Sequence, residues 1–95
     1  MDVLDPLFPH LVRTARMLLG WQQSELAACS GVSVAFIGRL ERGERLGQAR
    51  KLRQLRDALT DNGVIFEANE CRVGVWVEGQ HVQRLRTEFS EDARR

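Results

Sequence analysis

The stretch Gln23–Arg42, QSELAACSGVSVAFIGRLER, decides the fold of this 95-residue chain. It predicts two short helices that meet at a tight corner. Gly31 lies at the corner and ends the first helix, because glycine takes a left-handed conformation without steric cost. Ser33 begins the second helix, since its hydroxyl can accept a hydrogen bond from a free backbone amide. The apolar residues of the second helix keep three- and four-residue spacing, and they are Phe36, Ile37 and Leu40.

Several features occur together in and directly after this stretch. They are Gln23, the Leu26-Ala27 pair, Gly31, Val32, Ser33, Ile37 and the final sequence Leu40-Glu41-Arg42-Gly43. In this combination they resemble the lambda-repressor-like, Cro-type (XRE family) helix-turn-helix regulators. A plain helix hairpin with a glycine corner would also explain Gly31 and the apolar spacing. It would not explain the small and polar outer face of the second helix. The resemblance covers about Leu11 to Val77 and implies a mainly α fold with a four-helix, repressor-like helix-turn-helix domain.

The segments on either side supply the other helices of such a domain. Residues 1–9 contain two prolines and predict an N-terminal arm. Helical spacing of apolar residues predicts one helix from about His10 to Leu19 and another from about Gln48 to Asp61, with Asn62-Gly63 as its stop. Residues 10–63 therefore form the predicted DNA-binding domain.

Beyond this domain the spacing of the apolar residues changes from helical to alternating, with a repeat of two residues. The segments 64–67 and 73–77 are rich in β-branched and aromatic residues and predict a C-terminal β-hairpin. The stretch that follows fits a third short strand, which we favour, or a short amphipathic helix carrying Val82, Leu85 and Phe89. We divide the remaining chain into a hairpin and dimerisation extension, residues 64–86, and a polar tail, residues 87–95.

Positive charge is concentrated on one segment of the chain. The net charge is only +1, which argues against a protein coated in positive charge. Residues 39–56 nevertheless hold seven basic and two acidic residues, a local charge of +5, while the rest of the chain sums to −4. A basic stripe that begins inside the second helix of the corner is expected for contact with phosphate. A solvated face explains Arg53 and Arg56 equally well.

The resemblance implies which residues contact double-stranded DNA, because members of this family place the second helix in the major groove. The residues expected to face base edges are Val34, Ala35, Gly38 and Arg39. The residues expected to contact phosphate are Gln23, Ser33, Arg42 and Arg45. Arg39 is the best candidate for reading a base, since arginine matches the O6 and N7 acceptors of guanine.

The family also pairs an arginine of its first helix with a glutamate at the end of the reading helix. The matching residues here are Arg16 and Glu41. A bidentate contact between them would set the angle of the reading helix more than it would add net stability. The alternative is two exposed, unrelated charges.

We expect a homodimer, because a domain this small buries a modest share of its surface and often depends on a partner subunit. The hairpin is the expected contact, and its interface residues are Ile65, Phe66, Val75 and Trp76. Two copies related by a two-fold axis would bind an inverted-repeat operator, in the manner of a repressor. A second class remains open, in which the same fold binds a protein partner, as in an antitoxin or anti-activator. That class would explain the near-neutral charge and the C-terminal extension.

No residue pattern points to an enzyme, a cofactor or a metal site. The isolated His10 and His81 lack a neighbouring nucleophile or ligand spacing. Cys29 and Cys71 lack a Cys-x-x-Cys or Cys-His spacing and are expected to be buried or half-buried thiols. No apolar run is long enough to cross a membrane, and we expect a soluble, cytoplasmic protein.

Overall fold

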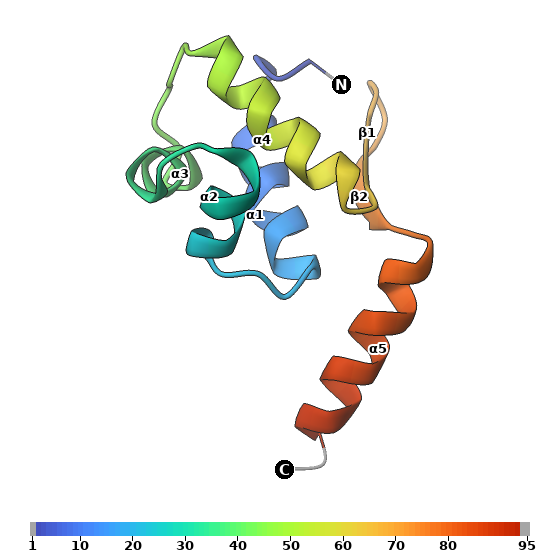
Figure 1. Ribbon diagram of the computed structural model, residues 1–95. Coiled ribbons are helices and arrows are strands. Elements are labelled where there is room, and N and C mark those ends of the chain that lie inside the picture. The colour runs from blue at the N-terminus through green and yellow to red at the C-terminus, as the bar shows by residue number, and fades with distance from the viewer. Residues whose placement is uncertain (1, 94–95) are drawn as a thin grey trace.

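The computed structural model describes residues 2–93, and the side chains of residues 2–88, as five helices and a two-stranded sheet (Figure 1). The helices are α1 (Phe8–Leu18), α2 (Gln23–Ser30), α3 (Val34–Glu41), α4 (Ala49–Asp61) and α5 (Gln80–Ala93), and the strands are β1 (Val64–Ala68) and β2 (Val73–Val77). This order confirms the predicted four helices followed by a β-hairpin. No helix of the described chain is long and apolar enough to span a membrane.

The segment before α1 lies against the core. Val3 is buried, and the Asp5 carboxylate accepts a hydrogen bond of 2.8 Å from the backbone N–H of Leu7. Helix α1 begins at Phe8, two residues earlier than predicted, with Pro9 in its first turn. Proline is tolerated there because the first amides of a helix have no intrahelical acceptor. Of the predicted arm, residue 1 lies outside the described residues.

The core lies between α1, α2, α3 and α4, and one face of the hairpin covers its edge. The largest side chains that are almost fully buried include Leu26, Ile37, Leu55 and Leu59, one or two from each of three helices. Each such side chain contributes about 1.5 to 3 kcal/mol by leaving water. Phe66 of β1 reaches the ring of Phe8 in α1, with 6.0 Å between the ring centres. The hairpin is thus packed on the helices.

The hairpin is antiparallel, and its alternation divides the predicted interface residues between two faces. Phe66 pairs with Val75, and both are half-buried against the core. Ile65 pairs with Trp76 on the opposite face, and the exposed fractions of the two residues are 40% and 55%, respectively. Only Ile65 and Trp76 of the four predicted residues are therefore presented outward, because successive side chains of a strand point to opposite faces.

The favoured third strand is wrong, since residues 80–93 form α5. Gly79 has a φ of 80°, which turns the chain out of the hairpin immediately before the helix. Val82 and Leu85 would lie on opposite faces of a strand but share one side of a helix, where both become largely buried. The predicted polar tail belongs in part to this helix, and residues 94 and 95 lie outside the described residues.

Candidate nucleic-acid interface

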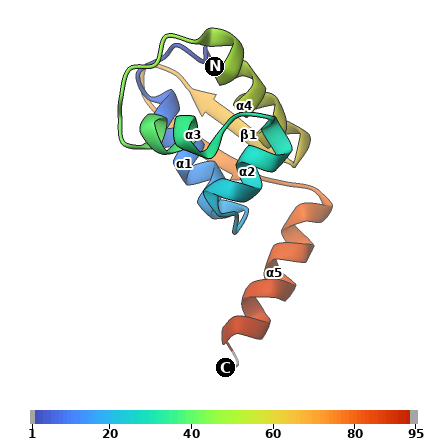
Figure 2. The same cartoon turned by 60° about the vertical axis from the view of Figure 1, so that its left-hand side comes forward.

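The corner between α2 and α3 is built as the sequence predicts. Gly31 has a φ of 76°, and its N–H donates to the carbonyl of Ala27 at 2.9 Å. The Ser33 hydroxyl then accepts a hydrogen bond of 3.1 Å from the N–H of Phe36. The left-handed glycine and the serine cap together end one helix and start the next within three residues, which leaves the start of α3 at the surface (Figure 2).

The outer face of α3 presents small side chains and one arginine. Ser33, Val34 and Ala35 are exposed at its start, and the Arg39 side chain is 53% exposed one turn later. Apolar side chains of this size can meet the methyl group of thymine, while an arginine can donate to guanine. The structure therefore brings four of the predicted contact residues onto one accessible surface.

Gly38 is an exception, because it is buried instead of exposed as expected. A Cβ built at Gly38 would lie 3.4 Å from Nη1 of Arg42 and 3.7 Å from Oε1 of Gln23. These two side chains therefore cover Gly38, and the absence of a side chain at this position lets them lie close to the α3 backbone. Gly38 provides space for its neighbours and does not itself face solvent.

Arg16 and Glu41 form a bidentate pair that joins α1 to the end of α3. Arg16 Nε donates to Glu41 Oε2 and Arg16 Nη2 donates to Oε1, both at 2.9 Å. Arg16 Nη1 also donates to the carbonyl of Trp21 at 2.7 Å. The two side chains are only 14% and 4% exposed. The hydrogen bond to Glu41 raises the pKa of Arg16, burial opposes that rise and the charge of Glu41 adds to it. Arg16 is therefore cationic at every physiological pH.

The same carboxylate also holds Gln23. The Gln23 side-chain amide donates to Glu41 Oε1 at 3.3 Å, from the first residue of α2. Gln23 is one of the residues that the sequence analysis predicts to contact phosphate. Glu41 thus connects α1, α2 and α3 through Arg16 and Gln23, and the orientation of a predicted DNA contact depends on a buried ion pair.

Glu44 is a residue of this surface that the sequence analysis did not identify. Its Oε1 accepts from Arg39 Nε at 3.2 Å, and its Oε2 lies 3.7 Å from Arg42 Nη2. All three side chains are at least 45% exposed. Glu44 therefore offsets part of the positive charge of the two arginines that are predicted to approach DNA. Paired side chains on a helix are three or four residues apart, and Glu44 is five residues from Arg39. The sequence pattern therefore does not predict this contact, which depends on the path of the loop after α3.

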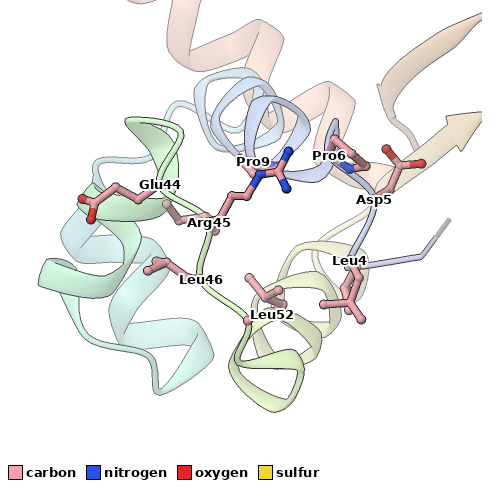
Figure 3. A pocket seen from close by; sticks show the side chains of 11 residues that line it. Leu4, Asp5, Pro6, Pro9, Glu44, Arg45, Leu46 and Leu52 are labelled. Carbon is pink, nitrogen blue, oxygen red and sulfur yellow. The ribbon is translucent and has the colours of Figure 1, made fainter.

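Arg45 lies apart from the other predicted contacts. It lines a half-open pocket of about 330 Å³ between the N-terminal segment, the loop after α3 and α4. Its side chain points toward Pro9, whereas Glu44 points the other way (Figure 3). The Arg45 side chain therefore points away from Glu44, the residue that pairs with Arg39 and Arg42.

The cysteines and the other metal-binding residue types lie scattered over the described part of the chain. No cluster of three or more His, Cys, Asp or Glu side chains able to hold a metal ion occurs among the described residues. Cys29 and Cys71 are free and exposed, so the expectation of buried thiols is wrong. Cys29 lies on the outer side of α2, and Cys71 lies in the hairpin turn, where neither contributes to the core.

An accessible second helix, braced by a first helix across a glycine corner, defines a helix-turn-helix DNA-binding domain. A family model described as Helix-turn-helix matches residues 12–59, about half of the chain. The chain belongs to this family, that of the Cro- and lambda-repressor-like regulators. Searches of curated proteins and of solved structures found no significant match.

Proposed function

We propose that this protein is a sequence-specific transcriptional repressor that binds an inverted-repeat operator as a homodimer. The observation that carries the proposal is the exposed outer face of α3, where Val34, Ala35 and Arg39 are accessible while Arg16 and Glu41 hold the helix from behind. A reading helix must be both exposed and rigidly oriented, because each base contact depends on its angle in the major groove.

The proposed roles follow from the position of each side chain. Val34 and Ala35 contact thymine methyl groups, and Arg39 donates to a guanine. The residues proposed to contact phosphate are Gln23, Ser33, Arg42 and Arg45. Arg45 is exposed in the loop after α3, and Gly38 is left out of the base contacts because it is buried. With two small apolar side chains at the helix start, DNA shape supplies part of the specificity.

The homodimer is proposed because one recognition helix contacts too few base pairs to define a site in a genome. Ile65 and Trp76 offer an exposed apolar surface on the outer face of the hairpin, away from α3 (Figure 1). A contact through this region would leave both recognition helices free. A two-fold axis would then turn them toward successive major grooves on one side of the duplex.

A salt titration of full-length protein on a labelled random-sequence duplex tests the DNA-binding part. We expect log K to fall linearly with log salt, with a slope of roughly −0.9 for each phosphate neutralised. Arg42→Ala should flatten the slope by about one unit, whereas Arg72→Ala in the hairpin turn, a matched arginine far from α3, should leave it unchanged. Absence of binding even at low salt would contradict the proposal and favour a protein-binding module.

Selection of bound sequences from a random DNA pool tests the operator. We expect an enriched inverted repeat with a guanine in each half-site. A single asymmetric half-site would contradict the dimeric arrangement while leaving DNA binding intact.

A further inference from the structure

An apolar groove runs between the end of α1, strand β2 and the first half of α5. It has a volume of about 630 Å³, and its apolar lining consists of Leu18, Val75, Trp76, Val77, Val82 and Leu85. Trp76 is 55% exposed and Leu18 is 41% exposed. Two large apolar side chains left in water beside a groove mark a surface that another molecule can cover.

Among the side chains of helix α5 that are described, those that anchor it to the body lie in its first half. The N–H of Glu78 donates to the carbonyl of Gly63 at 3.0 Å, and the His81 ring packs so closely on Gly63 that a Cβ there would lie 2.7 Å from it. Leu85 is the last buried residue described in the helix. Both views show the rest of α5 extending away from the other helices (Figures 1 and 2).

A helix held in this way needs further packing. Its 14 residues span about 21 Å, and isolated helices of this length are only marginally stable in water. The groove beside the first half of α5 and the second half, whose backbone extends away from the other helices, lie along one element. A single partner element could therefore cover both.

The charge order of α5 matches an antiparallel copy of itself. Its first half carries Arg84 and Arg86, and its second half carries Glu88, Glu91 and Asp92 in the sequence. Within one helix Arg84 Nε lies 4.0 Å from Glu88 Oε1, an exposed i,i+4 pair of little strength that a partner helix can replace. Two such helices placed antiparallel bring the basic half of each beside the acidic half of the other, whereas a parallel pair brings like charges together. Complementary charges of this kind select partner and orientation.

We propose that the groove is the homodimer contact, formed by antiparallel pairing of α5 from two copies of this chain, with Leu18 and Trp76 of each copy covered by the other. This inference rests on the proposed dimeric regulator and specifies its contact. It moves the centre of the interface from the hairpin to α5. Ile65, on the hairpin but absent from the groove lining, then contributes little.

Sedimentation of the full chain without DNA tests the contact. We expect a dimer at micromolar concentration. The Kd of dimerisation should rise at least about tenfold in the Leu18→Arg variant, because a charge would enter the apolar contact. Met17→Arg is the matched control, because Met17 is the preceding residue of α1, is 59% exposed and does not line the groove. It should change the Kd less than about twofold. A monomer at all concentrations, or equal effects of the two variants, would overturn the proposal.

A charge-exchange experiment covers the case in which Leu18→Arg fails to fold. One chain carries Arg84→Glu with Arg86→Glu, and the other carries Glu88→Arg with Glu91→Arg. Each chain alone should dimerise at least about tenfold more weakly than the wild type, and an equimolar mixture should form heterodimers of near wild-type affinity. Homodimers as tight as the wild type would overturn the antiparallel pairing.

Different results would contradict the proposed function and the proposed dimer contact. A chain that dimerises through α5 but binds no DNA would contradict the proposed function and support this contact. A chain that binds DNA as a monomer would overturn the contact and leave DNA binding in place.

Discussion

At the scale of single residues, the surface of α3 is governed by two glutamates with opposite effects. Glu41 is almost fully buried and holds Arg16 and Gln23 in fixed positions. Glu44 is exposed and occupies Arg39 and Arg42, the two arginines proposed to approach DNA. Glu41 therefore organises the surface, while Glu44 would compete with DNA for the same arginines in the proposed complex.

Replacement of Arg39 by alanine and replacement of Arg42 by alanine should impair DNA binding in different ways. Arg39→Ala is expected to cost about 1 to 3 kcal/mol on the selected operator and to relax preference at one base pair. Arg42→Ala should weaken all sequences alike, because phosphate contacts carry no sequence information. Affinity measurements on the operator and on single-base variants distinguish these results. Losses of the same kind for both residues would contradict the assignment.

Replacing Glu44 should strengthen DNA binding. Glu44→Gln removes a negative charge near the proposed phosphate path and frees both arginines, at the loss of exposed ion pairs worth little to stability. We expect a gain of about threefold to tenfold in affinity for random DNA and a steeper salt dependence. Glu67→Gln, which removes the partner of Arg72 in the hairpin, is the matched control and should leave affinity unchanged. Weaker binding by Glu44→Gln would show that Glu44 positions the arginines productively.

At the scale of elements, the angle between α2 and α3 depends on one backbone conformation. Gly31 has a φ of 76° and has only the end of Gln54 near its missing side chain, at 3.8 Å. A substitution there therefore tests backbone strain without a severe steric clash.

Gly31→Ala should lower the free energy of unfolding by about 1 to 2 kcal/mol, the cost of a left-handed residue with a Cβ. Gly47→Ala, in the loop before α4, lacks both a positive φ and any neighbour within 4 Å and should be neutral or slightly stabilising. Urea denaturation of both variants provides the comparison. Equal stabilities would mean that the corner does not require this conformation.

The contact between α1 and α3 depends on Arg16 and Glu41. Removal of either side chain should cost on the order of 3 kcal/mol, because the remaining charge stays buried without its partner. The double variant should cost much less than the sum. A double-mutant cycle in urea measures this coupling, and additive losses of a few tenths of a kcal/mol would indicate two independent charges.

The pH dependence of this contact follows from the raised pKa of Arg16. The contribution of Arg16 to stability is complete below the ordinary arginine pKa and is lost only as pH rises through the raised value.

At the scale of the whole molecule, the proposed dimer requires a defined distance between two recognition helices. One helical turn of DNA separates the centres of successive major grooves on one face by about 34 Å, or roughly 10 base pairs. Helix α5 and the hairpin lie on the opposite side of the body from α3, which lets one pairing contact and two DNA contacts coexist (Figure 1).

Changing the operator spacing should therefore have a periodic effect. Insertion of about 5 base pairs between half-sites is expected to reduce affinity to that of a single half-site, because it rotates one half-site to the far side of the duplex. Insertion of about 10 base pairs should partly restore binding. Electrophoretic mobility shifts on the series would measure this. A smooth dependence on spacing would contradict a rigid two-fold arrangement.

The sequence alone determined the local features of this protein. Gly31, Ser33 and the apolar spacing around Ile37 specify the corner, because caps and helical periodicity depend on neighbours a few residues away. The pairing of Arg16 with Glu41 also came from the sequence, through the family resemblance, and the structure places these side chains in bidentate contact. The change from helical to alternating period similarly located the hairpin.

Only the tertiary structure decided the features that depend on residues from different elements. Gly38 is buried because Gln23, from another helix, and Arg42 lie over it. Glu44 pairs with Arg39 through the path of a loop that has no period to read. The sequence of residues 80–93 fits both the alternating spacing of a strand and the spacing of a helix. These residues form a helix because Gly79 directs them away from the hairpin and Leu85 is buried. Local patterns specify elements, but burial and side-chain partners emerge only when the elements pack.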